Sequence, residues 1–256
     1  MTRPVDVGSP ADAWRLAVGT LTAVPVAPPR TVDARTAGRA MLLAPLAVLP
    51  LGLLVAVVGL AGREAGLAPL VTAVLAVAGL AAGSRALHLD GLSDTADGLT
   101  ASYDRRRSLE VMKSGTAGPA GVAAVVLVLL LQVTALTSVL REDRGWLLAG
   151  ALVCLSRCAL ALACTRGVPG ARPDGLGATY VGSVRPLATV TLWLGAALLA
   201  AVLAGVAGVV AVVVAAGVVV LVLRRTVTRF GGVTGDVFGA AVELALAALL
   251  VVASAG

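Results

Sequence analysis

Three carboxylates lie close together in an otherwise apolar chain, within the segment His88-Leu89-Asp90-Gly91-Leu92-Ser93-Asp94-Thr95-Ala96-Asp97-Gly98. The chain has 14 acidic residues, and Asp90, Asp94, Asp97 and Asp104 all fall in this short region. On a helix, offsets of four and seven residues place Asp94 and Asp97 on the same face as Asp90. Either a cation or buried partners must offset the resulting repulsion. Oxygen ligands of this kind suit a hard divalent ion such as Mg²⁺.

The composition is that of a membrane protein. Hydrophobic residues make up 59% of the 256 residues, charged residues only 13%, and the mean hydropathy is +0.98. This apolar excess is more than a soluble core of this size requires. Several runs without charged side chains reach the length of about 20 residues that a span needs. We therefore predict an all-α, polytopic transmembrane bundle with about seven spans, at residues 40–60, 66–84, 119–140, 146–165, 187–204, 208–223 and 237–255.

Basic residues collect in alternate connections, which sets the predicted orientation. Three arginines lie in the odd-numbered connections and Arg157 lies within a span, which leaves 16 of the 20 basic residues on the other side. The cytoplasmic parts are then the N-terminus and the segments 85–118, 166–186 and 224–236. The outer parts are the C-terminus and the turns 61–65, 141–145 and 205–207. The net charge of +6 follows largely from this topology, and we expect no nucleic-acid partner.

The chain is predicted to be one integral membrane domain, residues 1–256, without a cleavable signal, because acids and prolines interrupt its first dozen residues. Residues 12–27 are apolar but end in prolines, which favours a short interfacial or re-entrant helix over an eighth span. Cys154, Cys158 and Cys164 share one predicted span without a CxxC pair. We interpret them as small packing residues.

Other polar segments also fall on the predicted cytoplasmic side. The segment 105–113 has apolar residues at helical spacing and predicts an amphipathic helix on the membrane, although it would equally serve as a positive anchor. The glycines of the loop 115–121 can bring backbone amides against phosphate. Arg172, in Ala171-Arg172-Pro173-Asp174-Gly175-Leu176-Gly177, is a cation suited to phosphate pairing.

Asp236 begins the last predicted span, after the glycine-rich segment 229–235. In isolation it would be interpreted as a helix cap. Glu243 makes a functional role for Asp236 more credible than a cap alone, because Glu243 lies two turns along the same helix face. An ionisable group at membrane depth normally faces a cavity or a partner. The same inference applies to Arg157, since a basic residue at such depth costs about 2.5 to 3.5 kcal/mol on insertion scales. Pairing Arg157 with Glu243 is one economical arrangement.

Taken in order, these motifs resemble one family. The string HLDGLSDTADG, then RRRSLEVMK with downstream glycines, then ARPDGLG and GGVTGDVFGAAVEL, is similar to cobalamin synthases, the adenosylcobinamide-GDP ribazoletransferase family. The N-terminal TLTAVPV belongs to the same resemblance, which covers nearly the full chain. The histidine with three aspartates is its most specific part. One departure is Ser114, where the family usually has an acid after the Met-Lys pair, so the role of that acid does not carry over.

The resemblance implies an Mg²⁺-dependent transferase of the inner cell membrane that completes the nucleotide loop of vitamin B12. The ribose 3′-hydroxyl of α-ribazole, or of its 5′-phosphate, attacks the corrinoid-linked phosphorus of adenosylcobinamide-GDP and expels GMP. Such a transfer needs charge neutralisation and in-line positioning rather than covalent help from the protein. Carboxylates holding Mg²⁺, with arginines facing them, supply the neutralisation. The implied partners are these small molecules and the lipid bilayer, with homo-oligomerisation left open.

Individual residues are assigned from the motifs. The acids expected to hold Mg²⁺ are Asp90, Asp94, Asp97 and Asp236. The residues expected to contact substrate are Arg105, Lys113, Arg172 and Asp236. His88 is the only histidine of the chain and joins Asp90, Asp94 and Asp97 as a catalytic candidate. It either deprotonates the ribazole hydroxyl or orients Asp90 or another carboxylate.

Two other functions are weighed against this one. CDP-alcohol phosphotransferases also carry Asp-rich motifs at a cytoplasmic membrane surface, but in their signature an Ala-Arg pair closely follows an Asp-Gly pair. Here the Ala-Arg pair at 171–172 lies far from Asp97-Gly98. A cation or small-solute transporter would explain the intramembrane Arg157 and Glu243. However, transporters keep their polar groups near the bilayer midplane and often show inverted repeats, whereas this chain gathers them at one surface.

Overall fold

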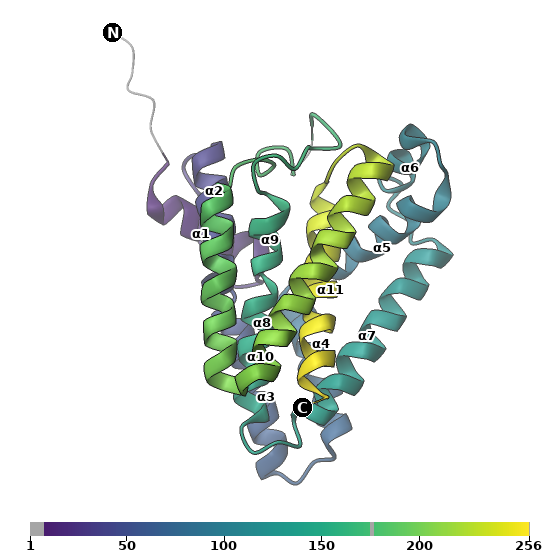
Figure 1. Ribbon diagram of the computed structural model, residues 1–256. Coiled ribbons are helices and arrows are strands. Elements are labelled where there is room, and N and C mark those ends of the chain that lie inside the picture. The colour runs from purple at the N-terminus through teal and green to yellow at the C-terminus, as the bar shows by residue number, and fades with distance from the viewer. Residues whose placement is uncertain (1–7, 175–176, 256) are drawn as a thin grey trace.

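The computed structural model describes residues 8–174 and 177–255, and these residues form helices and no strand (Figure 1). The predicted all-α fold is confirmed. Gly175 and Leu176, which belong to the predicted phosphate-binding segment, lie outside the described residues. The helices are α1 Pro10–Leu21, α2 Ala34–Ala47, α3 Leu49–Glu64, α4 Pro69–Gly83, α5 Leu87–Ala101, α6 Arg105–Val111, α7 Pro119–Val139, α8 Gly145–Ser156, α9 Cys158–Ala163, α10 Pro186–Phe230 and α11 Gly235–Ala253.

The predicted spans appear as long apolar helices. Five helical stretches are long and apolar enough to cross a membrane, and the number is six when the bent pair α4–α5 is counted as one broken span. The 45-residue α10 reverses direction at Ala204 and Gly205, whose backbone angles are not helical, so its two arms run antiparallel (Figure 1). Counting both arms gives seven crossings, and the break between them overlaps the predicted outer turn at residues 205–207. The chain is a multi-pass membrane protein.

The connections separate into two ends of the bundle. Figure 1 shows α5, α6 and the connection between α9 and α10 at one end, which we call the site end. The turn of α10, the short connections after α3 and α7, and the C-terminus lie at the opposite end. This is the separation that the distribution of basic residues predicted.

The first predicted span, 40–60, is longer than expected and broken. It begins at Ala34, is interrupted at Val48 and continues to Glu64. Pro45 and Pro50 flank the break, and neither has a backbone N–H to donate within the helix. The span predicted at 146–165 is similarly divided into α8 and α9 at Arg157.

The N-terminal α1 confirms the predicted short helix, although it begins at Pro10 and ends before the prolines. Ser9 and Asp12 form a capping box at its start. Its 12 residues extend roughly 18 Å at 1.5 Å per residue, which is less than the hydrocarbon thickness of about 30 Å. We conclude that α1 does not cross the membrane by itself.

A sharp bend separates α4 from α5. The two helices meet at 88°, and Arg85 and Ala86 between them have φ values of 57° and 54°, a left-handed conformation uncommon for residues other than glycine. Arg85 stabilises the bend by donating from Nη2 to the carbonyl of Gly19, at 2.8 Å, near the end of α1. The bend turns α5 away from the direction of the spans, so that α5 lies along the site end.

The last helix, α11, forms the centre of the bundle. Most of its side chains are buried, and it packs against α5, α7, both α8 and α9, and α10. By contrast, α3, α4, α7 and the first arm of α10 expose many Leu and Val side chains, as expected of surfaces that face lipid. Side chains that α11 directs inward therefore meet elements from most of the chain.

Candidate active site

The acids of the first motif lie on α5, whose middle contacts the start of α11. Asp90 is exposed, Asp94 is half-buried and Asp97 is buried. A Cβ atom at Gly91 would lie 2.6 Å from the backbone oxygen of Asp236. This distance is too short for a Cβ atom, so only glycine fits at this position. The glycine therefore allows α11 to approach, and the approach brings Asp236 into the electrostatic environment of Asp90 and Asp94.

The pKa of Asp94 reflects the charges of the other acids in this group. Partial burial raises the pKa of its carboxyl to about 6, and the negative charges of Asp90, Asp236 and Asp97 contribute to the rise, while Arg172 opposes it. Among the described residues, neither Asp90 nor Asp94 has a hydrogen-bond or ion-pair partner for its carboxylate. We call Asp90, Asp94 and Asp236 the acid face. The negative charge of the acid face therefore exceeds the positive charge that nearby side chains supply.

The acid face is chemically suited to a divalent cation. Its donors are carboxylate oxygens, and a bound cation would lower the repulsion that raises the pKa of Asp94. Within residues 8–174 and 177–255, no three His, Cys, Asp or Glu side chains already form a metal-binding arrangement. The residue types therefore fit Mg²⁺, and binding would require these side chains to draw closer together.

Asp97 has a different environment from the other two acids of α5. Its Oδ2 accepts from the backbone N–H of Gly118 at 2.6 Å, and its Oδ1 accepts from that of Gly121 at 2.8 Å. Both donors belong to the first turn of α7, where backbone N–H groups lack partners within the helix and favour a negative charge. Asp97 thus fixes the start of α7 against α5, and its predicted role as a metal ligand stays a prediction.

The segment 105–113 forms α6, which ends at Val111 and packs on the bundle. Asp104 caps it by accepting from the N–H of Arg107. Met112 is buried, and a Cβ atom at Gly98 would lie 2.5 Å from its Cγ. The apolar side of this segment thus contacts α5. Ser114, at the position of the family acid, is exposed and hydrogen-bonds to Thr116.

The three basic substrate candidates meet between α6 and residues 171–174. Arg105 donates from Nη2 to the carbonyl of Ala171 at 2.8 Å, and Arg172 donates from Nη2 to the carbonyl of Leu109. Lys113 forms an exposed ion pair with Asp174 at 3.7 Å. These contacts border an open groove of about 490 Å³, which we call the basic groove. Its lining residues are Asp104, Arg105, Arg106, Leu109, Glu110, Lys113, Ala171, Arg172, Pro173 and Asp174.

Backbone pairing positions Arg172 beside α11. The N–H of Ala171 donates to the carbonyl of Val233, and the N–H of Val233 donates to the carbonyl of Pro169, both at 2.9 Å. Thr234 then begins α11 by accepting from the N–H of Val237, and its hydroxyl donates to Asp236 at 3.1 Å. Through these bonds the two glycine-rich motifs of the sequence, far apart along the chain, form one wall of the site.

A second hollow, of about 260 Å³, lies next to the basic groove; we call it the apolar cavity. Its walls come from the end of α1, the start of α5, α2, α9, the described residues 172–174 and 177–181, and the segment that leads into α11 together with the start of that helix. Most of the lining is apolar, and the polar side chains that line it are Thr20, His88, Arg172, Asp174, Tyr180, Thr234 and Asp236. Arg172 and Asp174 line both hollows.

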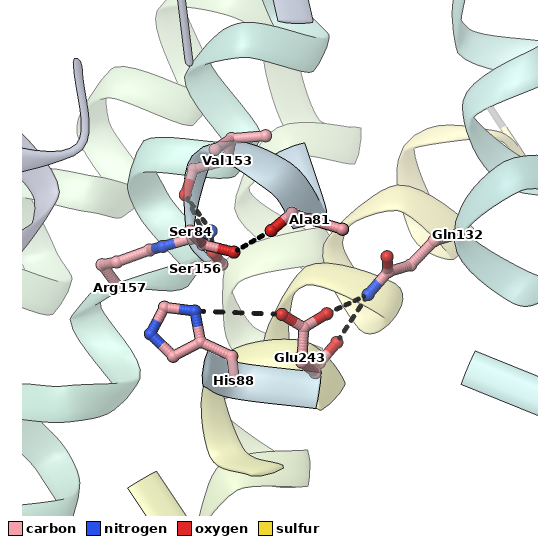
Figure 2. Close-up of polar contacts among 8 residues, drawn as sticks. All are labelled: Ala81, Ser84, His88, Gln132, Val153, Ser156, Arg157 and Glu243. Carbon is pink, nitrogen blue, oxygen red and sulfur yellow. Dashed lines mark hydrogen bonds and ion pairs between the residues drawn. The ribbon is translucent and has the colours of Figure 1, made fainter. Parts of the chain in front are cut away.

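His88 belongs to a buried polar group deeper in the bundle, which we call the deep cluster (Figure 2). His88 Nδ1 lies 4.0 Å from Glu243 Oε1, and Gln132 donates from Nε2 to Glu243 Oε2 at 2.7 Å. Figure 2 shows His88 and Gln132 on opposite sides of the Glu243 carboxylate. The carboxylate nearest to His88 is thus Glu243. Whether His88 acts as a base or orients an acid stays a prediction.

Arg157 completes the deep cluster without a direct ion pair to Glu243. Its side chain is 0% exposed, and Nη1 donates to the carbonyl of Val153 at 3.0 Å and to the hydroxyl of Ser156 at 2.8 Å. Its Nε and Nη2 atoms have no partner among the described residues. The predicted pairing of Arg157 with Glu243 is therefore not formed as a direct contact. Arg157 Nη1 bonds to groups of α8, Glu243 accepts from Gln132, and the two charges influence each other only electrostatically.

Sequence reasoning missed Gln132 and most of the apolar cavity. Gln132 is the only carboxamide side chain in the chain, and its position within a charge-free run was a usable signal. The cavity lining, which includes Met41, Leu160 and Phe238, had no comparable signal. Apolar residues of that kind occur throughout this sequence, and only the fold separates those that line a cavity from those that fill the core.

These features define a class: an integral membrane protein with carboxylates, guanidinium groups and two ligand-sized hollows at one end of a helical bundle. A family model described as Cobalamin-5-phosphate synthase matches residues 13–254. The chain belongs to this family, as its motifs indicated.

Individual relatives agree with that membership. A protein from a Nocardioides species is 62% identical over 240 residues, covering 93% of this chain and 96% of the relative. A Frankia casuarinae protein is 42% identical, covering 93% and 92%, and one from Bradyrhizobium diazoefficiens is 33% identical, covering 94% and 92%. All three are named adenosylcobinamide-GDP ribazoletransferase. No solved structure gives a significant match.

Proposed function

We propose that this chain is an adenosylcobinamide-GDP ribazoletransferase. It joins adenosylcobinamide-GDP to α-ribazole, or to α-ribazole 5′-phosphate, and releases GMP and adenosylcobalamin or its 5′-phosphate. The structural observation that carries the proposal is the meeting of the acid face with Arg172, beside two hollows, at one end of a membrane bundle. The family and the names of the relatives support the same reaction.

The proposed chemistry is one displacement at phosphorus. The ribose 3′-oxygen of the acceptor forms a bond to the corrinoid-linked phosphorus, the bond from that phosphorus to the bridging oxygen breaks, and GMP leaves with the bridging oxygen. Arg172 and Arg105 bind the diphosphate and hold its charge near the basic groove. His88, which lines the apolar cavity, accepts the hydroxyl proton at Nε2, the ring nitrogen that does not face Glu243.

The cofactor we propose is Mg²⁺, held by Asp90, Asp94 and Asp236. When bound, it neutralises charge that develops on the phosphate oxygens. Asp97 contributes by fixing α5 against the start of α7 through Gly118 and Gly121. This division gives the three acids of α5 two different tasks.

We further propose that the site end faces the cytoplasm, in the inner cell membrane. Basic residues favour the cytoplasmic side of a membrane, and in this chain they are concentrated at the site end. The opposite end and the C-terminus then face outward. Reactivity of a single cysteine introduced at Arg225 or at Glu64 toward a membrane-impermeant thiol reagent in intact cells tests this. Labelling at position 64 and not at 225 is expected.

The decisive test of the function is GMP release by Asp94→Asn in purified, detergent-solubilised protein. The substitution keeps the side-chain shape but removes a charge from the acid face, so GMP release from adenosylcobinamide-GDP and α-ribazole should be abolished while expression and folding are preserved. Asp143→Asn, at the opposite end of the bundle, is the matched control and should turn over normally. Full activity of Asp94→Asn would remove Asp94 from the proposed mechanism.

Metal dependence is tested separately. Chelation of divalent cations should stop GMP release by the wild-type protein, and added Mg²⁺ should restore it. Turnover that continues in chelator, at the rate seen with Mg²⁺, would contradict the proposed cofactor. Wild-type protein that releases no GMP under any metal condition would contradict the proposed function itself.

A further inference from the structure

The two hollows at the site end differ in the chemistry of their walls. The basic groove is open and is lined by Arg105, Arg106, Lys113 and Arg172. The apolar cavity is smaller, and its lining includes the large apolar side chains of Leu21, Met41, Leu160, Val181 and Phe238. A transferase of two dissimilar substrates needs two dissimilar subsites, so the difference bears on which substrate enters which hollow.

We propose that the apolar cavity binds the nucleoside acceptor, with its aromatic base against the apolar wall and its ribose toward Arg172 and Asp236, and that the basic groove binds the diphosphate of the donor. The assignment rests on the proposed function, which places the diphosphate near the basic groove, and goes beyond it by giving the acceptor a separate cavity.

The polarity of the cavity matches that of a nucleoside. An apolar heterocycle gains free energy when it leaves water for a wall of Leu, Met, Val and Phe side chains, roughly in proportion to the area buried. A diphosphate placed there would lose its hydration without compensation, which is costly for charged groups. The hydroxyls of a ribose, in contrast, find hydrogen-bond partners among Thr20, Tyr180 and Thr234, all of which line the cavity.

The size and position of the cavity agree with this assignment. Its volume of about 260 Å³ is near the lower limit of roughly 300 Å³ for small-molecule pockets, which accommodates a nucleoside and excludes a corrinoid macrocycle. Arg172 lines both hollows and is held by its bond to Leu109. A ribose at the Arg172 end of the cavity would therefore present its hydroxyl to a diphosphate lying in the groove.

Filling the cavity tests the assignment kinetically. Val181 is half-buried and lies in a connection, so Val181→Trp should reduce the space for the base without removing a core side chain. We expect the KM for α-ribazole to rise on the order of tenfold or more, since pocket volume discriminates by about that factor per group, while the KM for adenosylcobinamide-GDP stays unchanged. Val168→Trp, at another half-buried valine outside the cavity, should change neither constant.

An unchanged acceptor KM in Val181→Trp, or a rise confined to the donor KM, would overturn the assignment. A binding measurement keeps the proposal testable if Val181→Trp fails to fold. The natural cysteines are 0 to 9% exposed, so a cysteine introduced at the site end reacts selectively with a maleimide. Ala178→Cys in the cavity should be protected by α-ribazole and not by GMP, and Pro173→Cys in the groove should show the reverse.

The outcomes separate the two proposals. Wild-type protein that releases GMP, together with no protection of Ala178→Cys by α-ribazole, would overturn the subsite assignment and leave the proposed function intact. Protection of Ala178→Cys by GMP would place the donor in the cavity and also overturn the assignment. Absence of GMP release by the wild-type protein would instead contradict the proposed function.

Discussion

The acid face and the deep cluster are two carboxylate-containing groups built largely by the same pair of helices, α5 and α11. In the acid face, Asp90 and Asp94 have no partner for their carboxylates among the described residues. In the deep cluster, Glu243 accepts from Gln132 and faces His88. Asp236 and Glu243 are two turns apart on α11, roughly 10 Å along its axis. Depth along one helix thus separates carboxylates without a protein partner from a buried carboxylate that accepts a hydrogen bond from Gln132.

This comparison predicts opposite consequences for substitutions in the two groups. Removing a charge from the acid face should relieve repulsion and cost activity. Removing a charge from the deep cluster should leave buried partners without compensation and cost stability. The following experiments test that contrast, from the largest expected effect to the smallest.

The largest effect on stability is expected for Glu243→Leu. The substitution leaves Arg157 buried without its nearest opposite charge and Gln132 without its acceptor, and breaking a buried charge group typically costs about 3 to 5 kcal/mol of unfolding free energy. Thermal unfolding in detergent should show a large fall in midpoint. Glu243→Gln, which keeps an acceptor for Gln132, should fall less. A midpoint for Glu243→Leu equal to that of the wild type would contradict the contrast.

A backbone substitution should inactivate the acid face through its geometry. Gly91→Val places side-chain atoms where the backbone of Asp236 lies, so α5 and α11 must separate. We expect GMP release to fall by at least two orders of magnitude, because an error of about 1 Å in positioning can cost roughly 100-fold. The matched control is Gly217→Ala, since a Cβ at Gly217 would meet nothing within 4 Å. Equal activity of the two variants would contradict the importance of this approach.

Cation binding to the acid face should weaken in mild acid. The pKa of Asp94 is raised to about 6 from 3.8, so a proton competes with the cation as the pH falls through about 6. In the metal-free protein the raised pKa means that ionised Asp94 destabilises the fold above pH 6, and that this cost is relieved as the pH falls toward 3.8. The increase in unfolding temperature produced by Mg²⁺ should therefore be large at pH 7.5 and small at pH 5.

The same measurement on Asp94→Asn provides the control for that pH effect. With the titrating carboxyl removed, Mg²⁺ should stabilise the variant weakly and by the same amount at pH 7.5 and pH 5. A stabilisation of wild-type protein that does not depend on pH across this range would show that Asp94 does not bind the cation.

The smallest effect is expected at the opposite end of the bundle. Arg63 and Asp143 form an ion pair at 2.8 Å, but both side chains are exposed, and exposed pairs contribute little to stability because solvent screens them. Asp143→Asn should change neither the unfolding midpoint nor GMP release measurably. A clear loss in either quantity would mean that exposure does not predict the importance of a charge in this protein.

Features that depend on neighbouring residues were predictable from the sequence. The spans follow from hydropathy, the two ends of the bundle from the distribution of basic residues, and the helix under Asp90, Asp94 and Asp97 from their spacing. The turn inside α10 overlaps the predicted connection 205–207 between two spans. The family followed from motifs that are each continuous in the sequence. All of these signals are local, so one chain is enough to detect them.

Tertiary structure determined which motifs contact one another and which role each residue has. The pairing of residues 169–171 with Val233, the approach of α11 at Gly91 and the use of Asp97 to hold α7 all join segments far apart in the chain. The apolar cavity is likewise made by side chains that resemble any other apolar residue of this sequence. Spacing along the chain determined which residues share a helix face. The partners and the burial of these residues were determined by packing, because they depend on which distant helices come into contact.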